Sequence, residues 1–193
     1  FAVTPALAPE HARYLARFGS TRRMERDARK TADRPDPVRE AVGLPLGIQG
    51  GFFVGELGEF GQAMEGPDIE DYNMPPRGQP GLWCQWVPRN GERVAKLEKE
   101  DDELEEGVVW DAIGPDGGEK FTYYIEWLKY LIEHFLAPWG YKLSGTIEWQ
   151  GESEEDKGKI VLEDNVFRVP TPAAVMEMMG GIERTAMFFA QLK

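Results

Sequence analysis

The stretch at residues 119–140, EKFTYYIEWLKYLIEHFLAPWG, has the most regular pattern in the sequence and sets the expected fold. Its apolar residues recur at steps of three and four positions, which places them on one side of an α-helix. They are Phe121, Tyr124, Ile125, Leu128, Leu131, Ile132 and Phe135. Polar residues fall on the opposite side, and Pro138 with Gly140 ends the pattern. We therefore expect an amphipathic helix over residues 121–135.

Short apolar stretches bounded by turn residues lie on both sides of this helix. Residues 82–87 and 108–113 precede it and are expected to pair as antiparallel strands. Residues 141–150 and 159–169 follow it and are expected to form a second hairpin. The regular alternation of strand and helix that a wound parallel sheet requires is missing. The sequence therefore predicts an α+β fold, with an antiparallel sheet of about four to five strands in a ββαββ core.

The rest of the chain is expected to supply helices around this core. Apolar residues at helical spacing predict a helix over residues 10–29, which Gly19 and Ser20 could divide in two. A short helix is expected at 37–42, after a proline-rich break. Glycines and prolines are frequent between residues 43 and 81, so only one short strand, at 52–54, is expected there. A last apolar helix is expected over residues 173–192.

These elements divide the sequence into four segments that we expect to pack as one domain. Residues 1–43 form a basic helical arm and residues 44–81 a Gly/Pro-rich excursion. Residues 82–169 form the α+β core, and residues 170–193 form a C-terminal helix. The helices at the two ends are expected to pack around the sheet.

The composition excludes several classes of protein. The chain has 193 residues, of which 41% are hydrophobic and 11% aromatic, as in folded globular proteins. It has neither an apolar run long enough for a membrane span nor a secretion signal at its start, so we expect a cytoplasmic protein with no membrane partner. One Cys cannot form an intrachain disulfide, and one Cys with two His cannot build a Cys-rich zinc site. We expect neither a metal nor a cofactor.

Charge is unevenly distributed along the sequence. The chain has 34 acidic and 22 basic side chains and a net charge of -12. Residues 1–43 carry nine basic and six acidic groups, a net charge of +3, so the remaining residues carry -15. The densest acidic stretch, residues 92–119, holds eleven carboxylates. Its candidate partner-binding residues are Asp101, Asp102, Glu103, Glu105 and Glu106.

Two interpretations of this acidic stretch remain open. Like charges repel one another and keep a segment solvated, so the stretch is either an exposed loop that aids solubility or a docking surface for a basic partner. A second candidate contact lies at residues 71–81, where prolines and glycines are dense. This loop either presents Tyr72, Met74 and Arg77 as a semi-rigid contact surface or covers the edge of the following strand.

Few residues suggest catalysis. The glycine-rich segment at residues 55–61 resembles a phosphate loop in the spacing of Gly55, Gly58 and Gly61. It lacks the Lys and the Ser or Thr that such a loop requires, and its glutamates would repel phosphate. Cys84 lies in an apolar stretch between tryptophans, where a packed thiol is expected rather than a nucleophile. Three carboxylates next to tryptophans are candidates for acid–base catalysis, because desolvation raises the proton affinity of a carboxylate. They are Asp111, Glu126 and Glu148.

An arginine cluster within residues 22–29 also has two interpretations. Arg22, Arg23, Arg26 and Arg29 would suit nucleic-acid phosphates. The large acidic surplus elsewhere would repel that polyanion and offers the arginines carboxylates of their own chain. We therefore favour internal pairing over direct nucleic-acid binding.

Three functional hypotheses follow from these features. The leading hypothesis is a non-catalytic acidic protein that binds a basic protein surface. By analogy with inhibitors encoded by mobile elements, such a protein could be an inhibitor of that kind. The first alternative is a small hydrolase with an Asp/Glu acid–base pair in an aromatic-walled pocket. The second is a subunit of a larger assembly, with a neighbouring subunit or a second copy of the chain as its partner.

Overall fold

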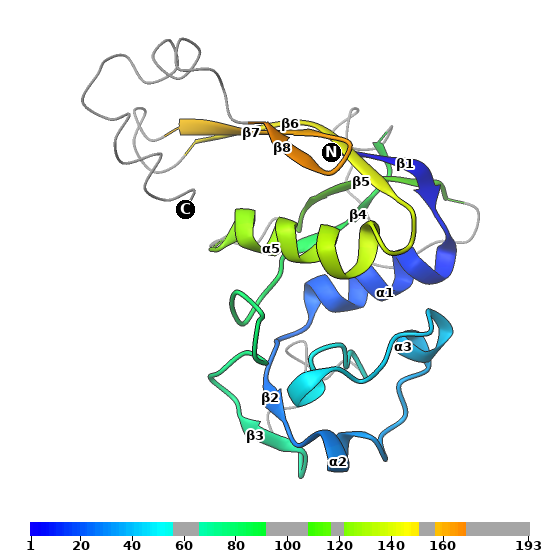
Figure 1. The fold of residues 1–193 in the computed structure, drawn as a ribbon, viewed down its shortest axis with the longest axis vertical. Coiled ribbons are helices and arrows are strands. Elements are labelled where there is room, and N and C mark those ends of the chain that lie inside the picture. Colours follow the sequence, from blue (N-terminus) through cyan, green and yellow to red (C-terminus); the bar gives the residue numbers. More distant parts are fainter. Residues whose placement is uncertain (56–65, 92–107, 117–121, 151–156, 169–193) are drawn as a thin grey trace. The chain divides into compact units, whose positions relative to one another are not determined.

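The computed structural model describes residues 1–55, 66–91, 108–116, 122–150 and 157–168 (Figure 1). The chain divides into two compact units. The first unit, Ala2–Lys142, contains the described helices and two small antiparallel sheets. The second unit consists of Phe1 and Leu143–Lys193, and its described part is an antiparallel sheet. The chain thus has the expected α+β character.

The larger sheet of the first unit has the strand order β4-β5-β1. β4 (Trp86–Arg89) pairs antiparallel with β5 (Trp110–Pro115), which confirms the expected pairing of these two regions. β4 begins later than the predicted 82–87, because Gln85 takes a left-handed backbone with φ of 57° that interrupts the extended chain. β1 (Ala2–Leu7) pairs antiparallel with the other side of β5 and was not predicted.

α1 (Pro9–Ser20) packs its apolar face against β4 (Figure 1). Its buried residues include Tyr14, Leu15 and Phe18, as the helical spacing predicts. The helix ends at Ser20, where Gly19 and Ser20 were expected as a possible division. A helical continuation to residue 29 is wrong, because the chain becomes extended at Thr21 and then forms the short strand β2 (Glu25–Arg26).

The amphipathic helix predicted over residues 121–135 is confirmed from Tyr124 onward, whereas Thr122 and Tyr123 are not helical and Phe121 lies outside the described residues. The helix comprises α5 (Tyr124–Leu131), continued by one π-helical turn, η2 (Ile132–Leu136). Phe135 is completely buried, and its ring lies within 5.0 to 6.0 Å of several other rings. These are Tyr14, Phe18, Phe52, Tyr130 and Trp139. The helix pair α1 and α5 therefore shares an aromatic core.

The remaining part of the first unit is built from short elements. β2 pairs antiparallel with β3 (Ile69–Asp71). α2 (Ala28–Thr31) follows β2, and α3 (Pro37–Ala41) confirms the predicted short helix. A 3-10 turn, η1 (Ile48–Gly50), precedes the predicted strand at 52–54, which does not form.

Residues 52–54 were expected to form a strand, but a backbone amide of this segment is hydrogen-bonded to a side chain instead of to another strand. Val54 is completely buried, and its backbone N–H donates a hydrogen bond of 3.1 Å to the carboxylate of Asp36. A buried backbone amide needs a partner, and the carboxylate serves where a neighbouring strand was expected. Apolar character alone therefore overpredicted a strand here.

The second unit has the strand order β6-β7-β8 in its described part. β6 (Lys142–Gln150) pairs antiparallel with β7 (Lys157–Glu163), and β7 with β8 (Val166–Arg168). A single arm was predicted over 159–169, but Asp164 and Asn165 both have positive φ, 50° and 69°. Two successive left-handed residues are typical of a tight hairpin turn, so the predicted strand is two strands.

The predicted ββαββ core therefore omits several strands that the structure contains. The larger sheet of the first unit also uses β1, and β2 with β3 forms a separate sheet. The predicted C-terminal helix, residues 173–192, lies outside the described residues. Within the described ranges, no helix combines the length and the apolar character that crossing a membrane requires.

Candidate interaction surface

The loop that follows β3, residues 72–77, is fixed at its start by Arg22. The guanidinium of Arg22 lies 4.1 Å above the ring of Tyr72, and its Nε donates a 3.1 Å hydrogen bond to the Tyr72 carbonyl. Its Nη2 donates to the side-chain oxygen of Asn73 at 3.2 Å. The loop is thus held by stacking and by hydrogen bonds from one arginine.

Gln49 fixes the other end of the loop. Its side-chain oxygen accepts a 2.7 Å hydrogen bond from the backbone N–H of Arg77, and its Nε2 donates to Glu25 at 3.0 Å. The backbone N–H of Glu25 in turn donates to the carbonyl of Met74 at 2.9 Å. Residues 74–77 are therefore tied both to β2 and to η1.

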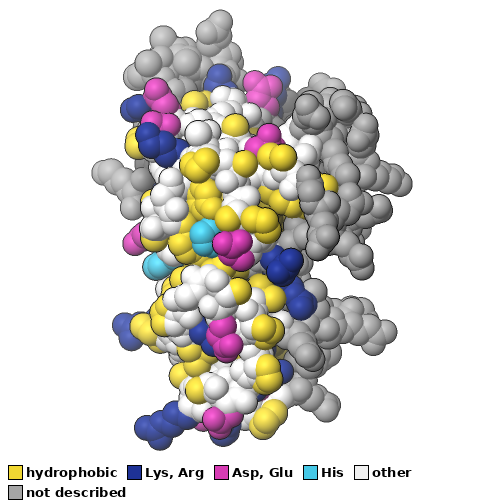
Figure 2. All heavy atoms as spheres, turned by 90° about the vertical axis from the view of Figure 1, so that its right-hand side faces the viewer, with side chains coloured by type: hydrophobic (Ala, Val, Ile, Leu, Met, Phe, Trp, Pro, Cys, Tyr) yellow, Lys and Arg dark blue, Asp and Glu magenta, His cyan; other side chains and the backbone are white. Residues whose placement is uncertain are grey.

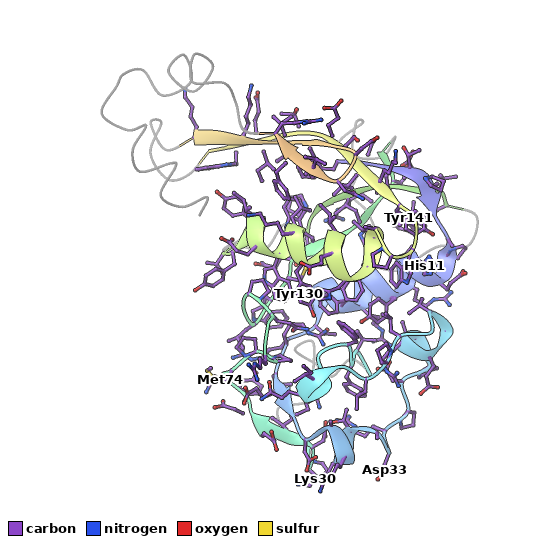
Figure 3. The ribbon with its side chains drawn as sticks, in the orientation of Figure 1. His11, Lys30, Asp33, Met74, Tyr130 and Tyr141 are labelled. Carbon is purple, nitrogen blue, oxygen red and sulfur yellow. The ribbon has the colours of Figure 1, made fainter. Side chains whose placement is uncertain are left out.

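This anchoring leaves apolar side chains in solvent. Met74 is 51% exposed, and Ile48, next to Gln49, is 67% exposed. Figure 3 shows Met74 at the end of a loop and pointing away from the fold. Of the three predicted contact residues, Met74 and Arg77 are exposed, whereas Tyr72 is half-buried under Arg22. The structure brings these three residues together on one loop.

Two of the clustered arginines are buried inside the first unit. Arg26 forms a buried ion pair with Asp68, and Arg34 contacts the other oxygen of the same carboxylate at 2.8 Å. Burial opposes ionisation of Asp68, but the hydrogen bond and charge of Arg26, together with the charge of Arg34, outweigh it and lower the pKa of the carboxyl. For Arg26, internal pairing is therefore the correct interpretation.

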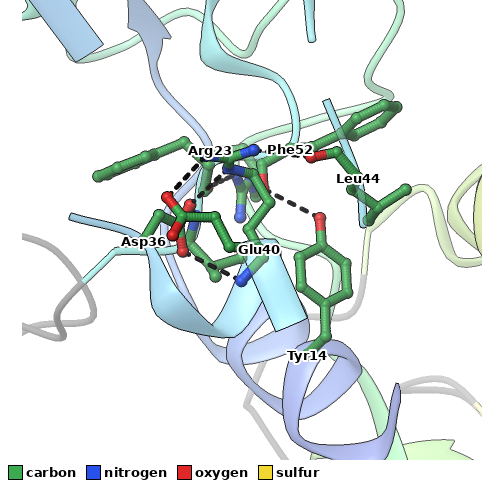
Figure 4. A network of polar contacts seen from close by, with 9 residues as sticks. Tyr14, Arg23, Asp36, Glu40, Leu44 and Phe52 are labelled. Carbon is green, nitrogen blue, oxygen red and sulfur yellow. Dashed lines mark hydrogen bonds and ion pairs between the residues drawn. The ribbon is translucent and has the colours of Figure 1, made fainter. Parts of the chain in front are cut away.

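Arg23 and Asp36 belong to a second buried polar network, shown in Figure 4. Arg23 donates to the hydroxyl of Thr21 at 2.8 Å and to the carbonyl of Phe53 at 2.5 Å. Asp36 accepts from Nε of Arg39 at 3.1 Å. Burial lowers the pKa of Arg23, which has neutral oxygens as its hydrogen-bond acceptors.

The described residues are electrically balanced. They contain sixteen acidic and sixteen basic side chains, so the whole net charge of -12 belongs to the rest of the sequence. On the face drawn in Figure 2, acidic, basic and apolar side chains are interspersed. The candidate partner-binding residues of the acidic stretch lie outside the described residues. They are Asp101, Asp102, Glu103, Glu105 and Glu106.

The three candidate catalytic carboxylates occupy different surroundings. Asp111, on β5, accepts a 2.8 Å hydrogen bond from the backbone N–H of Gly91. Glu126, on α5, is exposed. Glu148, on β6, is exposed as well, and Lys159 of β7 is its partner in the strand register. Asp111 thus has a structural hydrogen bond, and Glu126 and Glu148 lie on the surface of their elements.

Cys84 is completely buried, as predicted. Burial raises the pKa of its thiol to about 12, so the thiolate that a nucleophile requires is scarce at neutral pH. In the part of the chain that the structure describes, no group of three or more His, Cys, Asp or Glu residues is placed to hold a metal ion.

A histidine–tyrosine contact was missed by the sequence analysis. Nδ1 of His11 and the hydroxyl of Tyr141 are 2.8 Å apart, and this hydroxyl accepts a hydrogen bond from the backbone N–H of Ala8 at 3.0 Å. The ring of His11 also stacks on Trp139 at 4.1 Å. Figure 3 shows His11 and Tyr141 beside each other at the start of α1. These residues are far apart in sequence, so no local pattern could have joined them.

The loop at residues 72–77 is anchored at both ends and exposes Met74 and Arg77. It belongs to the described part of the chain, which is electrically balanced and which we call the framework. The buried arginines hold the framework together and are not exposed to solvent. No protein-family model, no curated protein and no solved structure matches this chain, so its own residues carry the functional argument.

Proposed function

We propose that this chain is a non-catalytic acidic protein that binds a basic surface of another protein. The observation that carries the proposal is the partition of charge. Residues 56–65, 92–107 and 151–156 have net charges of -3, -5 and -4, which together account for the whole -12. The acidic surplus is therefore concentrated in three short segments, while the framework between them is balanced.

The positions of the arginines support the proposal. Arg23 and Arg26 are 2% and 3% exposed, and Arg26 and Arg34 share the carboxylate of Asp68. The hydrogen bonds and ion pairs of these cations are made to groups of the first unit. Much of the negative charge is then available to a partner.

Charge concentrated in this way favours rapid and salt-sensitive association. A surface of one sign attracts a partner of the opposite sign over about 10 Å at moderate ionic strength, and added salt screens that attraction. Complementary charge selects the partner and orients it, whereas apolar contacts add affinity. The exposed Met74 and the anchored loop at 72–77 are suited to such apolar contact, because an ordered loop loses little entropy on binding.

The proposal is tested with a fluorescent oligolysine peptide as a probe of basic charge. In one variant, Asp101, Asp102, Glu103, Glu105 and Glu106 are replaced by Asn or Gln. In the control variant, five exposed carboxylates of the described framework are replaced in the same way. These are Glu10, Asp33, Glu40, Glu70 and Glu133.

Both variants have a net charge of -7 in place of -12, so they differ only in where charge was removed. We expect the peptide to bind the first variant more weakly than the control, measured by fluorescence anisotropy at low salt. Equal affinity of the two variants would show that only net charge matters and would refute a docking surface at residues 101–106.

A further inference from the structure

Among the described residues of the first unit, three buried polar side-chain atoms have no hydrogen-bond partner. They are Nε of Arg23, Oε1 of Gln79 and Nε1 of Trp127. Burying a polar group without a partner is unfavourable, and buried polar side chains in folded proteins are almost always hydrogen-bonded. The three atoms therefore call for a common explanation.

All three side chains contact the same group of aromatic rings. The guanidinium of Arg23 lies 4.4 Å above the ring of Phe18, and the rings of Phe18 and Trp127 are 5.9 Å apart. The ring of Trp127 is 5.5 Å from that of Tyr130, whose hydroxyl is 3.2 Å from Nε2 of Gln79. Figure 3 shows Tyr130, which belongs to α5, on the side of that helix that faces α1.

A second tryptophan shows what is unusual about Trp127. Trp86 and Trp127 are both almost completely buried. The indole N–H of Trp86 donates a 2.8 Å hydrogen bond to the carbonyl of Tyr124, whereas that of Trp127 has no acceptor in the part of the chain that the structure describes. Buried indole N–H groups normally find an acceptor, so the difference points to an acceptor from outside the chain.

The unpartnered atoms restrict the chemistry of that molecule. Arg23 and Trp127 each offer an N–H donor, whereas Gln79 offers an acceptor. The amide of Gln79 cannot reverse, because its Nε2 donates to the carbonyl of Gly51. An anion would satisfy the two donors and would be repelled by the amide oxygen. A water molecule can accept from a donor and donate to the amide oxygen, and buried water typically bridges such groups.

We infer that Arg23, Gln79 and Trp127, whose unpartnered atoms lie around one group of aromatic rings, bind ordered water inside the first unit. The water completes the hydrogen bonding of three segments: the chain after α1, the loop at 76–82 and α5. Gln79 is two residues from Arg77, and Arg23 follows the Arg22 that stacks on Tyr72. The water thereby fixes the base of the loop at 72–77, although the water site itself does not depend on the proposed function.

The inference is tested by NMR on the full-length, ¹⁵N-labelled chain. Indole N–H signals are assigned with Trp127→Phe and Trp86→Phe, and cross-relaxation between each indole proton and water is measured. We expect the Trp127 proton to show a direct contact with long-lived water and the Trp86 proton, which already has the Tyr124 carbonyl, to show none. No contact at Trp127, or an equal contact at Trp86, would overturn the inference.

Two further measurements keep the test decisive. The Nε–H signal of Arg23 should show the same water contact, which can be measured even if Trp127→Phe does not fold. Sodium acetate or phosphate should leave the Trp127 indole signal unchanged at constant ionic strength. A saturable shift of that signal would mean that the cluster binds an anion, and the water assignment would then be wrong.

Discussion

Arg26 and Asp68 form a buried ion pair that joins β2 to the chain just before β3. Asp68 is completely buried and Arg26 is 3% exposed, so neither charge can turn to water. Arg34 shares the same carboxylate, and the backbone N–H of Asp27 donates to the carbonyl of Asp68 at 2.8 Å. This carboxylate therefore organises the region that supports the loop at 72–77.

Replacing Asp68 with Asn should destabilise the protein strongly. The substitution leaves the buried guanidinium of Arg26 without its counter-charge, and breaking one side of a buried pair costs about 3–5 kcal/mol. Urea unfolding at pH 7, followed by tryptophan fluorescence, measures the loss. Asp33→Asn is the matched control, because Asp33 is exposed and its replacement should change stability by less than about 0.5 kcal/mol. Similar losses in the two variants would contradict the role of Asp68.

The same carboxylate should make stability fall in acid. The pKa of Asp68 is lowered in the folded protein, so its contribution is fully present above the unfolded pKa of about 3.9. That contribution is lost as the pH falls through the lower, folded pKa, where the native carboxylate takes up its proton. Unfolding free energies measured between neutral pH and the acid limb should therefore converge for wild type and Asp68→Asn. A constant difference at all pH values would be inconsistent with this linkage.

Gly19 should not tolerate even a methyl group. A Cβ at this position would lie 2.5 Å from the carbonyl oxygen of Trp86 and 2.7 Å from a methyl group of Val87, where α1 meets β4. Alanine gains about 1 kcal/mol of helix propensity, but overpacking typically costs about 1–3 kcal/mol, and here one neighbour is backbone. We expect Gly19→Ala to lower the thermal midpoint.

The control for Gly19 lies on the same helix. Arg13 is exposed on α1, and Arg13→Ala should leave the thermal midpoint nearly unchanged. A stabilising effect of Gly19→Ala would mean that α1 does not approach β4 as closely as the structure shows.

Cys84 should react with thiol reagents only after unfolding. Its side chain is completely buried and its pKa is raised to about 12, so both access and thiolate are lacking in the native state. A disulfide reagent at pH 8 should therefore label the native chain slowly and the urea-denatured chain at once. Because the chain has one Cys, the denatured sample is its own reference. Rapid labelling in native buffer would contradict the burial of the thiol.

Local pattern was sufficient to predict the elements that depend on local contacts. The helix over 121–135 was predicted because its apolar stripe is continuous, and α3 because Pro37 begins it after a break in the chain. β1 was missed because its partner, β5, is more than a hundred residues away in sequence. Pro5 inside β1 also argues against a strand when only local propensity is considered.

The polar interior was the least predictable part. Arginine side chains are normally exposed, so no sequence rule would have predicted that Arg23 is buried or that Arg26 pairs with Asp68. The excess of carboxylates suggested internal pairing in general but not which carboxylate was used. Exposure of Met74 likewise depends on long-range bonds from Glu25 and Gln49 to its loop.

The salt dependence of oligolysine binding tests the central claim most directly. If residues 101–106 present their charge to a basic partner, the logarithm of the wild-type affinity should fall steeply as the logarithm of salt concentration rises. The variant lacking those five carboxylates should show a clearly shallower slope, while the equally charged framework control should keep a slope close to that of wild type. Identical slopes for all three proteins, or binding that does not respond to salt, would contradict the account.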